Sequence, residues 1–181
     1  MHDDASAYRR FMNGDEGGFD EILHTSHDHL IYFIYQYVKN FEDAEDLAAE
    51  TFMELVVHKR RFDFRSSFKT YLFAIARHKA IDHVRREKRR PHTSLDDLSR
   101  ETADLLCVEK AVITTDTLAR VKAICETLAP DYATYLHLYF FEELDNEEIA
   151  QIMKKTKKQI ANISYRAKAA LKEALGKEET P

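Results

Sequence analysis

Residues that break helices are rare in this sequence. The 181 residues include only four glycines and three prolines. Since these residue types most often end helices and form tight turns, their scarcity favours long helices joined by few turns. The composition, 44% hydrophobic and 33% charged, excludes a disordered or fibrous chain and supplies enough apolar side chains for a buried core. We therefore expect an all-α fold.

Several other features are missing altogether. No run of about 18 apolar residues is present, so we expect no membrane insertion. The N-terminal MHDDASAYRR lacks the charged-then-apolar order of a signal peptide. Cys107 and Cys125 form no C-x-x-C pair, which predicts free thiols in a reducing cytoplasm. Without a glycine-rich phosphate loop or a nucleophile beside a base, the chain is not predicted to be an enzyme, and no cofactor or metal is expected.

Charged residues are segregated along the chain. Residues 59–90 hold twelve basic and three acidic side chains, and residues 152–181 hold eight and three. The segments 1–58 and 91–151 each hold thirteen acidic side chains against three and four basic ones, so the whole chain has a net charge of -5. Two basic blocks between acidic ones predict two separate contacts with a polyanion such as nucleic acid.

Apolar residues recur at helical spacings through most of the first half. The patterns span residues 19–37, 42–58 and 68–89. The second begins with acidic residues, as suits a helix N-terminus, and Ser66 or Ser67 is expected to cap the third. A polar segment, residues 91–115, then predicts a linker, in which Ser94 would cap a short helix. The sequence thus predicts two small helical domains, residues 1–90 and 116–178, joined by this linker.

The C-terminal part contains two capping boxes, in which a residue at the helix start and one three positions later bond each other's backbone. The first, Asp145 with Glu148, predicts a short helix over residues 146–153. The second, Thr156 with Gln159, predicts a helix that begins immediately afterwards. Two helices joined by so short a turn form a helix-turn-helix. Further helices are expected over residues 117–128 and 131 to about 141.

The second helix of this motif is strongly basic. Residues 152–172 hold seven basic and no acidic side chains. In a helix-turn-helix the start of the second helix enters the DNA major groove, where Asn162 could read a base edge and lysines neutralise phosphates. A solvated basic helix on an ordinary bundle is the alternative. The residues assigned to this DNA surface are Lys155, Lys157, Lys158, Asn162, Tyr165 and Arg166.

In the other basic block, cations alternate with aromatic side chains. Exposed rings offer stacking faces for unpaired bases, while cations follow the nucleic-acid backbone. Some of these rings, such as Phe68, are alternatively part of the core. Phe62 and Phe64 are expected to be exposed because they fall in a loop between helices, where burial is harder to arrange.

Three segments together resemble the bacterial RNA polymerase sigma factors, and among these the short extracytoplasmic-function type. They are DAEDLAAETFMEL (residues 43–55), FKTYLFAIARHKAIDHVRREKRR (residues 68–90) and the stretch from LAP at residue 128 to EAL at residue 175. The match covers nearly the whole chain, with the motifs in the family's order. The resemblance implies a region 2 domain over residues 1–90 and a region 4 domain over residues 116–178.

The resemblance also implies roles for particular residues. RNA polymerase core and promoter DNA are the implied partners, together with an anti-sigma factor. Core polymerase would contact Asp43, Asp46, Leu47 and Glu50, although Leu47 is alternatively a core residue. The minus-ten element would be melted and read by a loop and the helix after it. The residues of this second surface are Phe62, Phe64, Arg65, Ser67, Phe68, Lys69, Arg77, His78, Arg85 and Arg86. The helix-turn-helix would read the minus-thirty-five element.

Six positions differ from the residues that are frequent in the family. Three of them lie in the implied polymerase and minus-ten helices, and three lie around the start of the minus-thirty-five reading helix. These differences predict an unusual promoter sequence rather than a loss of function. The positions are Ala49, Tyr71, His78, Gln159, Ala161 and Ile163.

Two other interpretations compete with this one. His24, His27 and His29 in HTSHDH suggest a metal site or a phosphohydrolase, but the further His and Asp ligands such a hydrolase needs on other helices are not visible. The second alternative is a conventional transcription regulator or a helical RNA-binding module. That protein would bind nucleic acid alone, whereas a sigma factor of this type needs polymerase to set the spacing of its two domains.

Overall fold

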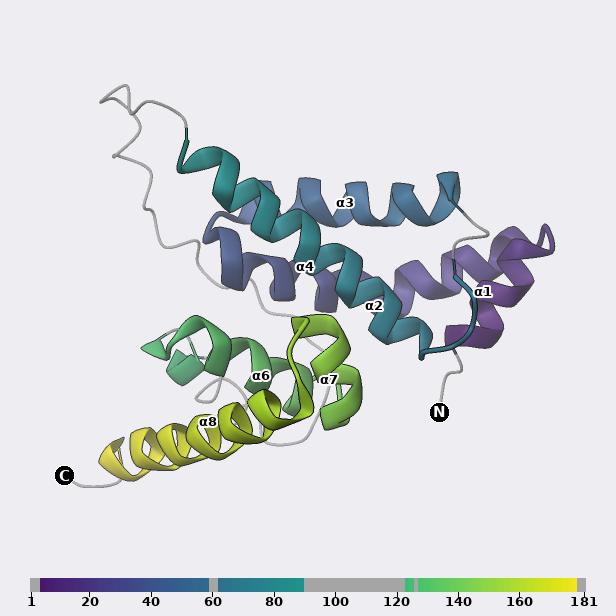
Figure 1. Cartoon of the computed structure of the whole chain (residues 1–181). Helices are drawn as coiled ribbons and strands as arrows, with labels where there is room; N and C mark the ends of the chain where they lie inside the picture. The colour runs from purple at the N-terminus through teal and green to yellow at the C-terminus, as the bar shows by residue number, and fades with distance from the viewer. Residues whose placement is uncertain (1–3, 59–61, 90–122, 126, 179–181) are drawn as a thin grey trace.

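The computed structural model describes residues 4–58, 62–89, 123–125 and 127–178, and every regular element in these ranges is a helix. The all-α prediction is therefore confirmed there. The predicted linker and most of the helix predicted over residues 117–128 lie outside the described residues. Within them, no helix combines the length and the apolar character needed to cross a bilayer. The labelled helices (Figure 1) are α1 (Asp4–Met12), α2 (Glu16–Val38), α3 (Phe41–Val57), α4 (Phe68–Glu87), α6 (Pro130–Phe140), α7 (Asn146–Met153) and α8 (Lys157–Glu178).

Helix α2 is the centre of the N-terminal part, because α1, α3 and α4 all pack against it. It begins at Asp15, whose side chain accepts a hydrogen bond from the Gly17 N–H. It ends at Lys39, which adopts a left-handed backbone and donates to the Tyr35 carbonyl. The side chains that α2 buries completely are Ile22, Leu30, Phe33 and Ile34.

Helix α1 closes one end of this group. It ends at a turn containing Gly14, which has a φ of 96°. The buried ring of Tyr8 stacks on Phe68 at a centroid distance of 4.7 Å and meets Phe62 edge-on at 5.7 Å. Burial raises the pKa of the Tyr8 phenol to about 12. Helix α1 thereby covers the loop that leads into α4, an arrangement that helical spacing from residue 19 onward did not predict.

The C-terminal part is the predicted helix-turn-helix supported by α6. Both capping boxes are confirmed: Asp145 with Glu148 at the start of α7, and Thr156 with Gln159 at the start of α8. The hydroxyl of Tyr135 on α6 lies 2.9 Å from the Asn146 amide oxygen and 2.7 Å from the Ser164 hydroxyl. This buried phenol thus joins all three helices and fixes the angle between α7 and α8.

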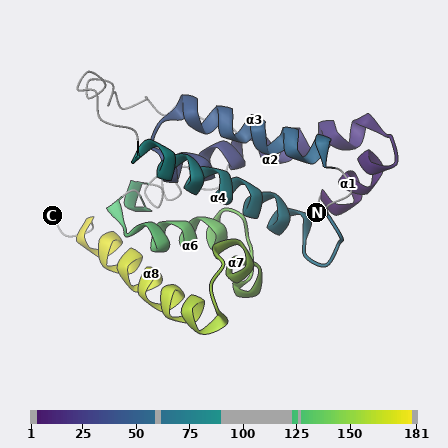
Figure 2. The same ribbon diagram turned by 45° about the horizontal axis from the view of Figure 1, so that its top comes forward.

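The two parts pack directly against each other. Helix α6 contacts α2, and helix α7 contacts α4 (Figure 2). Helix α3 lies on the opposite side of α2 and α4 (Figure 1). The hydroxyl of Thr134 on α6 lies 3.0 Å from that of Tyr37 on α2. The ring of His137 stacks on Tyr32 and also contacts Phe33. The chain therefore encloses one continuous core, with α3 facing away from α6, α7 and α8.

Gly18 provides a sharp test of the packing between α1 and α2. A Cβ atom at this position would collide with the Ala7 carbonyl oxygen and lie 2.8 Å from the Phe11 backbone nitrogen. Since backbone cannot yield as a flexible side chain does, Gly18→Ala should lower the free energy of unfolding by roughly 1–3 kcal/mol. Chemical denaturation would measure the change.

The matched control is Gly176→Ala in α8, where a Cβ meets nothing within 4 Å. This substitution should raise the free energy of unfolding by about 0.5–1 kcal/mol, because alanine loses less backbone entropy in a helix. Equal effects of the two substitutions would contradict the close approach of α1 to α2.

Candidate functional site

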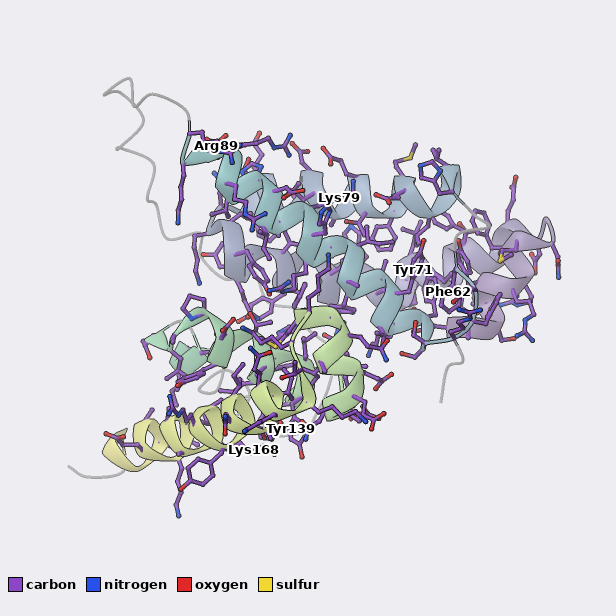
Figure 3. The ribbon with its side chains drawn as sticks, viewed as in Figure 1. Phe62, Tyr71, Lys79, Arg89, Tyr139 and Lys168 are labelled. Atoms are coloured by element: carbon purple, nitrogen blue, oxygen red, sulfur yellow. The ribbon has the colours of Figure 1, made fainter. Side chains whose placement is uncertain are left out.

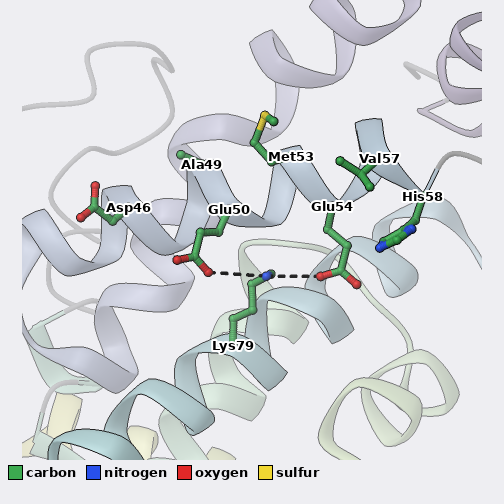
Figure 4. A pocket seen from close by; sticks show the side chains of 8 residues that line it. All are labelled: Asp46, Ala49, Glu50, Met53, Glu54, Val57, His58 and Lys79. Carbon is green, nitrogen blue, oxygen red and sulfur yellow. Dashed lines mark ion pairs between the residues drawn. The ribbon is translucent and has the colours of Figure 1, made fainter.

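An open pocket lies along the outer face of α3 (Figure 4). Met53 and Val57, which are 59% and 66% exposed, form an apolar strip in it. Carboxylates flank this strip, and the lysine Lys79 reaches in from α4. A surface with exposed apolar side chains inside a charged rim has the character of a protein docking site. The pocket is lined by Asp46, Ala49, Glu50, Met53, Glu54, Val57, His58 and Lys79.

Lys79 holds the wall of this pocket in place. Its ammonium lies 3.5 Å from a Glu50 carboxylate oxygen and 3.2 Å from one of Glu54, as the dashed lines in Figure 4 mark. Two carboxylates share one lysine, so the pocket remains negatively charged after this pairing. A basic partner surface would complement that charge.

The four predicted polymerase-contact residues occupy different environments. Asp46 and Glu50 are exposed in the pocket wall. Asp43 is half-buried and pairs with His83 at 3.4 Å. Leu47 is only 3% exposed, so it is a core residue, which was the alternative left open by the sequence. The sequence prediction missed Met53 and Val57, although both follow the same face of the helix at intervals of four residues.

The expectation that Phe62 and Phe64 are exposed in the loop before α4 is wrong for Phe62. For Phe68, the first residue of α4, the alternative of a core residue is the correct one. Phe62 is 4% exposed and Phe68 is 2% exposed. Phe62 packs among Tyr8, Tyr71 and Phe68, as its position beside Tyr71 in Figure 3 illustrates. These rings are buried because α1, which is distant in sequence, covers the loop. They support the shape of this surface rather than offering free stacking faces.

Other predicted members of this surface remain accessible. Phe64 is half-buried, with the Arg9 guanidinium 4.7 Å above its ring, and its φ of 59° turns the loop sharply. The side chain of Arg65 is 89% exposed. Further along α4, His78 and Arg85 both pair with Asp82, at 3.3 and 3.6 Å, and both are exposed. Arg86 is exposed as well and Arg77 is half-buried, so a band of cations follows α4 from its N-terminal loop to its end.

The basic helix α8 presents the predicted DNA-reading side chains. Lys158, Asn162 and Arg166 are exposed, and Tyr165 is 78% exposed. Two other predicted members are engaged within the motif. Lys155 pairs with Asp131 on α6 at 2.9 Å, and Lys157 donates a hydrogen bond to Glu147, which raises the pKa of that lysine.

The α8 surface extends beyond the predicted set. Lys168 lies over the ring of Tyr139 on α6 at 3.8 Å from its centroid (Figure 3). This cation–π contact anchors the middle of α8 to α6. The N-terminal half of α8 leaves Lys158 and Asn162 exposed.

A buried carboxylate lies where the two parts of the chain meet. The side chain of Glu142, just after α6, is completely shielded from solvent. One of its oxygens accepts from His29 on α2 at 2.9 Å and lies 3.2 Å from the His137 ring, while the other lies 3.1 Å from the Lys69 ammonium on α4. Burial by itself would raise the pKa of Glu142, but hydrogen bonds from His137 and His29 and the positive charge of those rings hold it well below its ordinary value.

Two of the three histidines that suggested a metal site have other partners. His27 pairs with Asp28 at 2.8 Å, and His29 pairs with Glu142. In the part of the chain that the structure describes, no group of three or more His, Cys, Asp or Glu side chains could hold a metal ion.

Comparison with known proteins decides between the remaining interpretations. The Sigma-70 region 2 family model matches residues 22–90. The ECF RNA polymerase sigma factor SigM of Bacillus subtilis is 30% identical over 157 residues, which are 84% of this chain and 92% of that protein. The chain belongs to the ECF sigma factors of bacterial RNA polymerase. This sigma factor is also 27% identical over 177 residues to SigW of Bacillus subtilis, spanning 92% of this chain and 94% of SigW.

Solved structures share the fold. A structure of CnrH in complex with the cytosolic domain of CnrY has a TM-score of 0.67 at 18% identity and covers 98% of this chain and all of the other. A co-crystal structure of the sigma factor RpoE with the anti-sigma factor NepR from Bartonella quintana has a TM-score of 0.67 at 22% identity, covering 87% and 96%. The family expected from the sequence motifs is thus confirmed, and the chain is a transcription initiation factor that directs RNA polymerase to promoters.

The depressed pKa of Glu142 makes stability depend on pH. A carboxyl whose folded pKa lies below its ordinary value of 4.5 stabilises the fold above that pH, and the contribution is lost as the pH falls toward the folded pKa. Glu142→Gln should therefore lower the free energy of unfolding by roughly 1–3 kcal/mol at pH 7, and much less at about pH 2–3. Denaturation at a series of pH values would measure both curves.

The control is Glu143→Gln, which changes the neighbouring exposed glutamate. Its stability curve should stay close to that of the wild type at every pH. A constant offset between Glu142→Gln and the wild type from neutral to acid pH would show that Glu142 carries no special charge contribution.

Proposed function

We propose that this sigma factor divides its work among three surfaces in two domains, residues 1–90 and 116–178, joined by residues 91–115. The outer face of α3 docks on core polymerase. The loop before α4 and the outer face of α4 bind and melt the minus-ten element. The helix-turn-helix of α7 and α8 reads the minus-thirty-five element. One observation carries this proposal: α3 has a pocket with an apolar strip and an acidic rim, and α8 of the same chain has a separate basic face.

The α3 surface suits a helical, basic partner. Met53 and Val57 provide apolar area at its centre, while Asp46 and Glu50 provide negative charge at its rim. An interface with an apolar centre and complementary rim charges gains affinity from the first and orientation from the second. The corresponding helix in the family docks on the coiled coil of the largest polymerase subunit, and we assign the same partner here.

The α4 surface suits a single DNA strand. Arg65 is exposed in the loop before α4, and Arg85 and Arg86 are exposed near its C-terminal end, so cations at both ends of the surface can neutralise phosphates. Phe64 lies at the edge of this surface in the loop. Because unstacking a base costs a few kcal/mol, a surface that binds only the separated strand can drive melting. Phe62 and Phe68 are excluded from direct stacking by their burial, so their contribution is to shape the loop.

The α8 surface suits duplex DNA. Asn162 can form paired hydrogen bonds with an adenine edge, and Lys158 and Arg166 lie beside it to contact phosphates. The two domains bind weakly on their own, so polymerase is needed to fix their spacing on a promoter.

The remaining elements of the proposal follow from this role. The chain supplies specificity and the polymerase supplies the chemistry, so the sigma factor is not itself an enzyme and acts in the cytoplasm with no cofactor. Two solved structures of the same fold are complexes: RpoE with the anti-sigma factor NepR, and CnrH with the cytosolic domain of CnrY. We assign an anti-sigma factor as a further partner of this chain.

Charge reversal on α3 tests the docking surface. Asp46→Lys with Glu50→Lys should weaken binding to core polymerase by about tenfold or more, because like charges would then face each other across the interface. Fluorescence competition against a labelled sigma factor would give the affinity. Glu45→Lys, an exposed position on α3 outside the pocket, should leave the affinity within about twofold. Equal losses in both variants would mean that overall charge, not this pocket, sets the affinity.

Substitution on α8 tests the division of labour. Asn162→Ala should weaken binding to a promoter duplex by about 1–3 kcal/mol. Lys158→Ala should reduce the slope of log affinity against log salt concentration by about one, because one phosphate contact is lost. The duplex would be selected from a random library by the wild-type sigma factor with polymerase.

Lys172→Ala is the control, because it removes an exposed cation from the far part of the same helix. Polymerase affinity should be unchanged in all three variants. A loss of polymerase binding with Asn162→Ala or Lys158→Ala would contradict separate docking and reading surfaces.

A further inference from the structure

Two carboxylates from the C-terminal part reach the start of α4. Glu142 follows α6, and Glu148 lies in the first turn of α7. Both meet side chains in the first turn of α4, within the surface assigned to minus-ten DNA. The contact between α4 and α7 is extensive, although these helices are far apart in the sequence.

Glu142 binds Lys69 twice. The Lys69 ammonium lies 3.1 Å from a carboxylate oxygen of Glu142 and donates to the Glu142 backbone carbonyl, also at 3.1 Å. The second carboxylate oxygen bonds His29 on α2. One completely buried side chain therefore joins the C-terminal part to two helices of the N-terminal part. A buried ion pair of this kind is costly to separate unless each charge finds a new partner.

Glu148 joins the ends of two helices. One of its oxygens accepts from the Asp145 backbone N–H, completing the capping box of α7. The other accepts from the Ser67 hydroxyl at 2.6 Å and from the Thr70 hydroxyl at 3.2 Å. Ser67 is the residue that caps α4. The negative charge thus lies at the N-termini of both helices, where the helix dipoles favour an anion.

We propose that Glu142 and Glu148 form an intramolecular latch that holds the two parts closed and occupies the phosphate-binding start of α4. The assignment of that position to DNA rests on the proposed function. In the closed form, Lys69 and the N-terminus of α4 are bound by carboxylates of the same chain. A DNA phosphate is an anion of the same kind and competes for the same groups.

The latch leaves the docking surface open. Helix α3, which carries the pocket, lies on the side of α2 and α4 opposite to α6 and α7 (Figure 1). Among the described residues of the C-terminal part, none lines the pocket. The closed chain can therefore dock on polymerase while the start of α4, one part of its minus-ten surface, is covered. Opening then exposes Lys69 and Ser67 only where DNA phosphates are present to replace the carboxylates. Binding of DNA phosphates to the start of α4 is thereby disfavoured in the free sigma factor.

The latch is tested in the full-length chain without DNA or polymerase. Glu142→Gln and Glu148→Gln keep the size of each side chain but remove the charge, and glutamine still supports a capping box at position 148. Hydrogen exchange at the first-turn amides of α4 and small-angle scattering would report opening. Each substitution should raise the exchange rate of these amides by about tenfold or more, and the double variant should have a larger radius of gyration.

Two controls separate opening from unfolding. Glu143→Gln should behave as the wild type. In the other variants, core amides of α2 and α8 should lose protection only by the amount that the global free energy of unfolding falls, which is less than the loss at the first turn of α4. His29→Gln changes only the N-terminal side of the latch, so it should also raise exchange in α4, whereas His27→Gln on the same helix should not. These two variants keep the test valid if position 142 proves intolerant of glutamine.

Unchanged exchange and unchanged scattering in Glu142→Gln, Glu148→Gln and His29→Gln would overturn the latch. That result would leave the proposed function intact, because no polymerase or DNA is present in the measurement. Conversely, failure of the chain to bind polymerase would contradict the proposed function. The exchange and scattering results on the latch would still hold, because they are obtained without polymerase.

Discussion

The buried carboxylate of Glu142 determines how the two parts of this molecule are arranged. A charge without solvent contact must be matched by partners, and these come from three different helices: His137 on α6, His29 on α2 and Lys69 on α4. Their geometry fixes where α6 lies across α2 and α4. Around this point, Tyr32 and Phe33 pack on His137, and Glu148 reaches the cap of α4. The position of α7 and α8 relative to the proposed docking surface on α3 follows from this arrangement.

The same arrangement explains how an acidic chain can carry DNA-binding surfaces. The acidic pocket of α3 faces away from the C-terminal part, so it is available to a basic partner. The start of α4 is covered by carboxylates of the same chain, while the cations of α8 point outward. The surfaces proposed for docking, melting and duplex reading therefore lie on different faces, so one of them can change its state while the others keep theirs. Separation of faces by charge also limits binding to nucleic acid before polymerase is engaged.

Local features were predictable from the sequence, and contacts between distant residues were not. The capping boxes at Asp145 and Thr156 predicted the boundaries of the helix-turn-helix because they act within four residues. The burial of Phe62 depends on Tyr8, more than fifty residues earlier, so no local pattern could reveal it. A glutamate such as Glu142 is expected on the surface from its residue type. Only the folded arrangement brings a lysine and two histidines to it. Met53 and Glu50, in contrast, are neighbours on one helix face through their spacing of three residues, which the sequence already contains.

Binding to core polymerase is the most direct test of the function assigned to this chain. The purified full-length protein would be mixed with sigma-free bacterial core polymerase and passed over a sizing column. Stoichiometric co-elution that is lost on addition of another sigma factor is the expected result. Absence of co-elution at micromolar concentration, together with tight binding to duplex DNA alone, would contradict it and would indicate a conventional DNA-binding regulator built on the same fold.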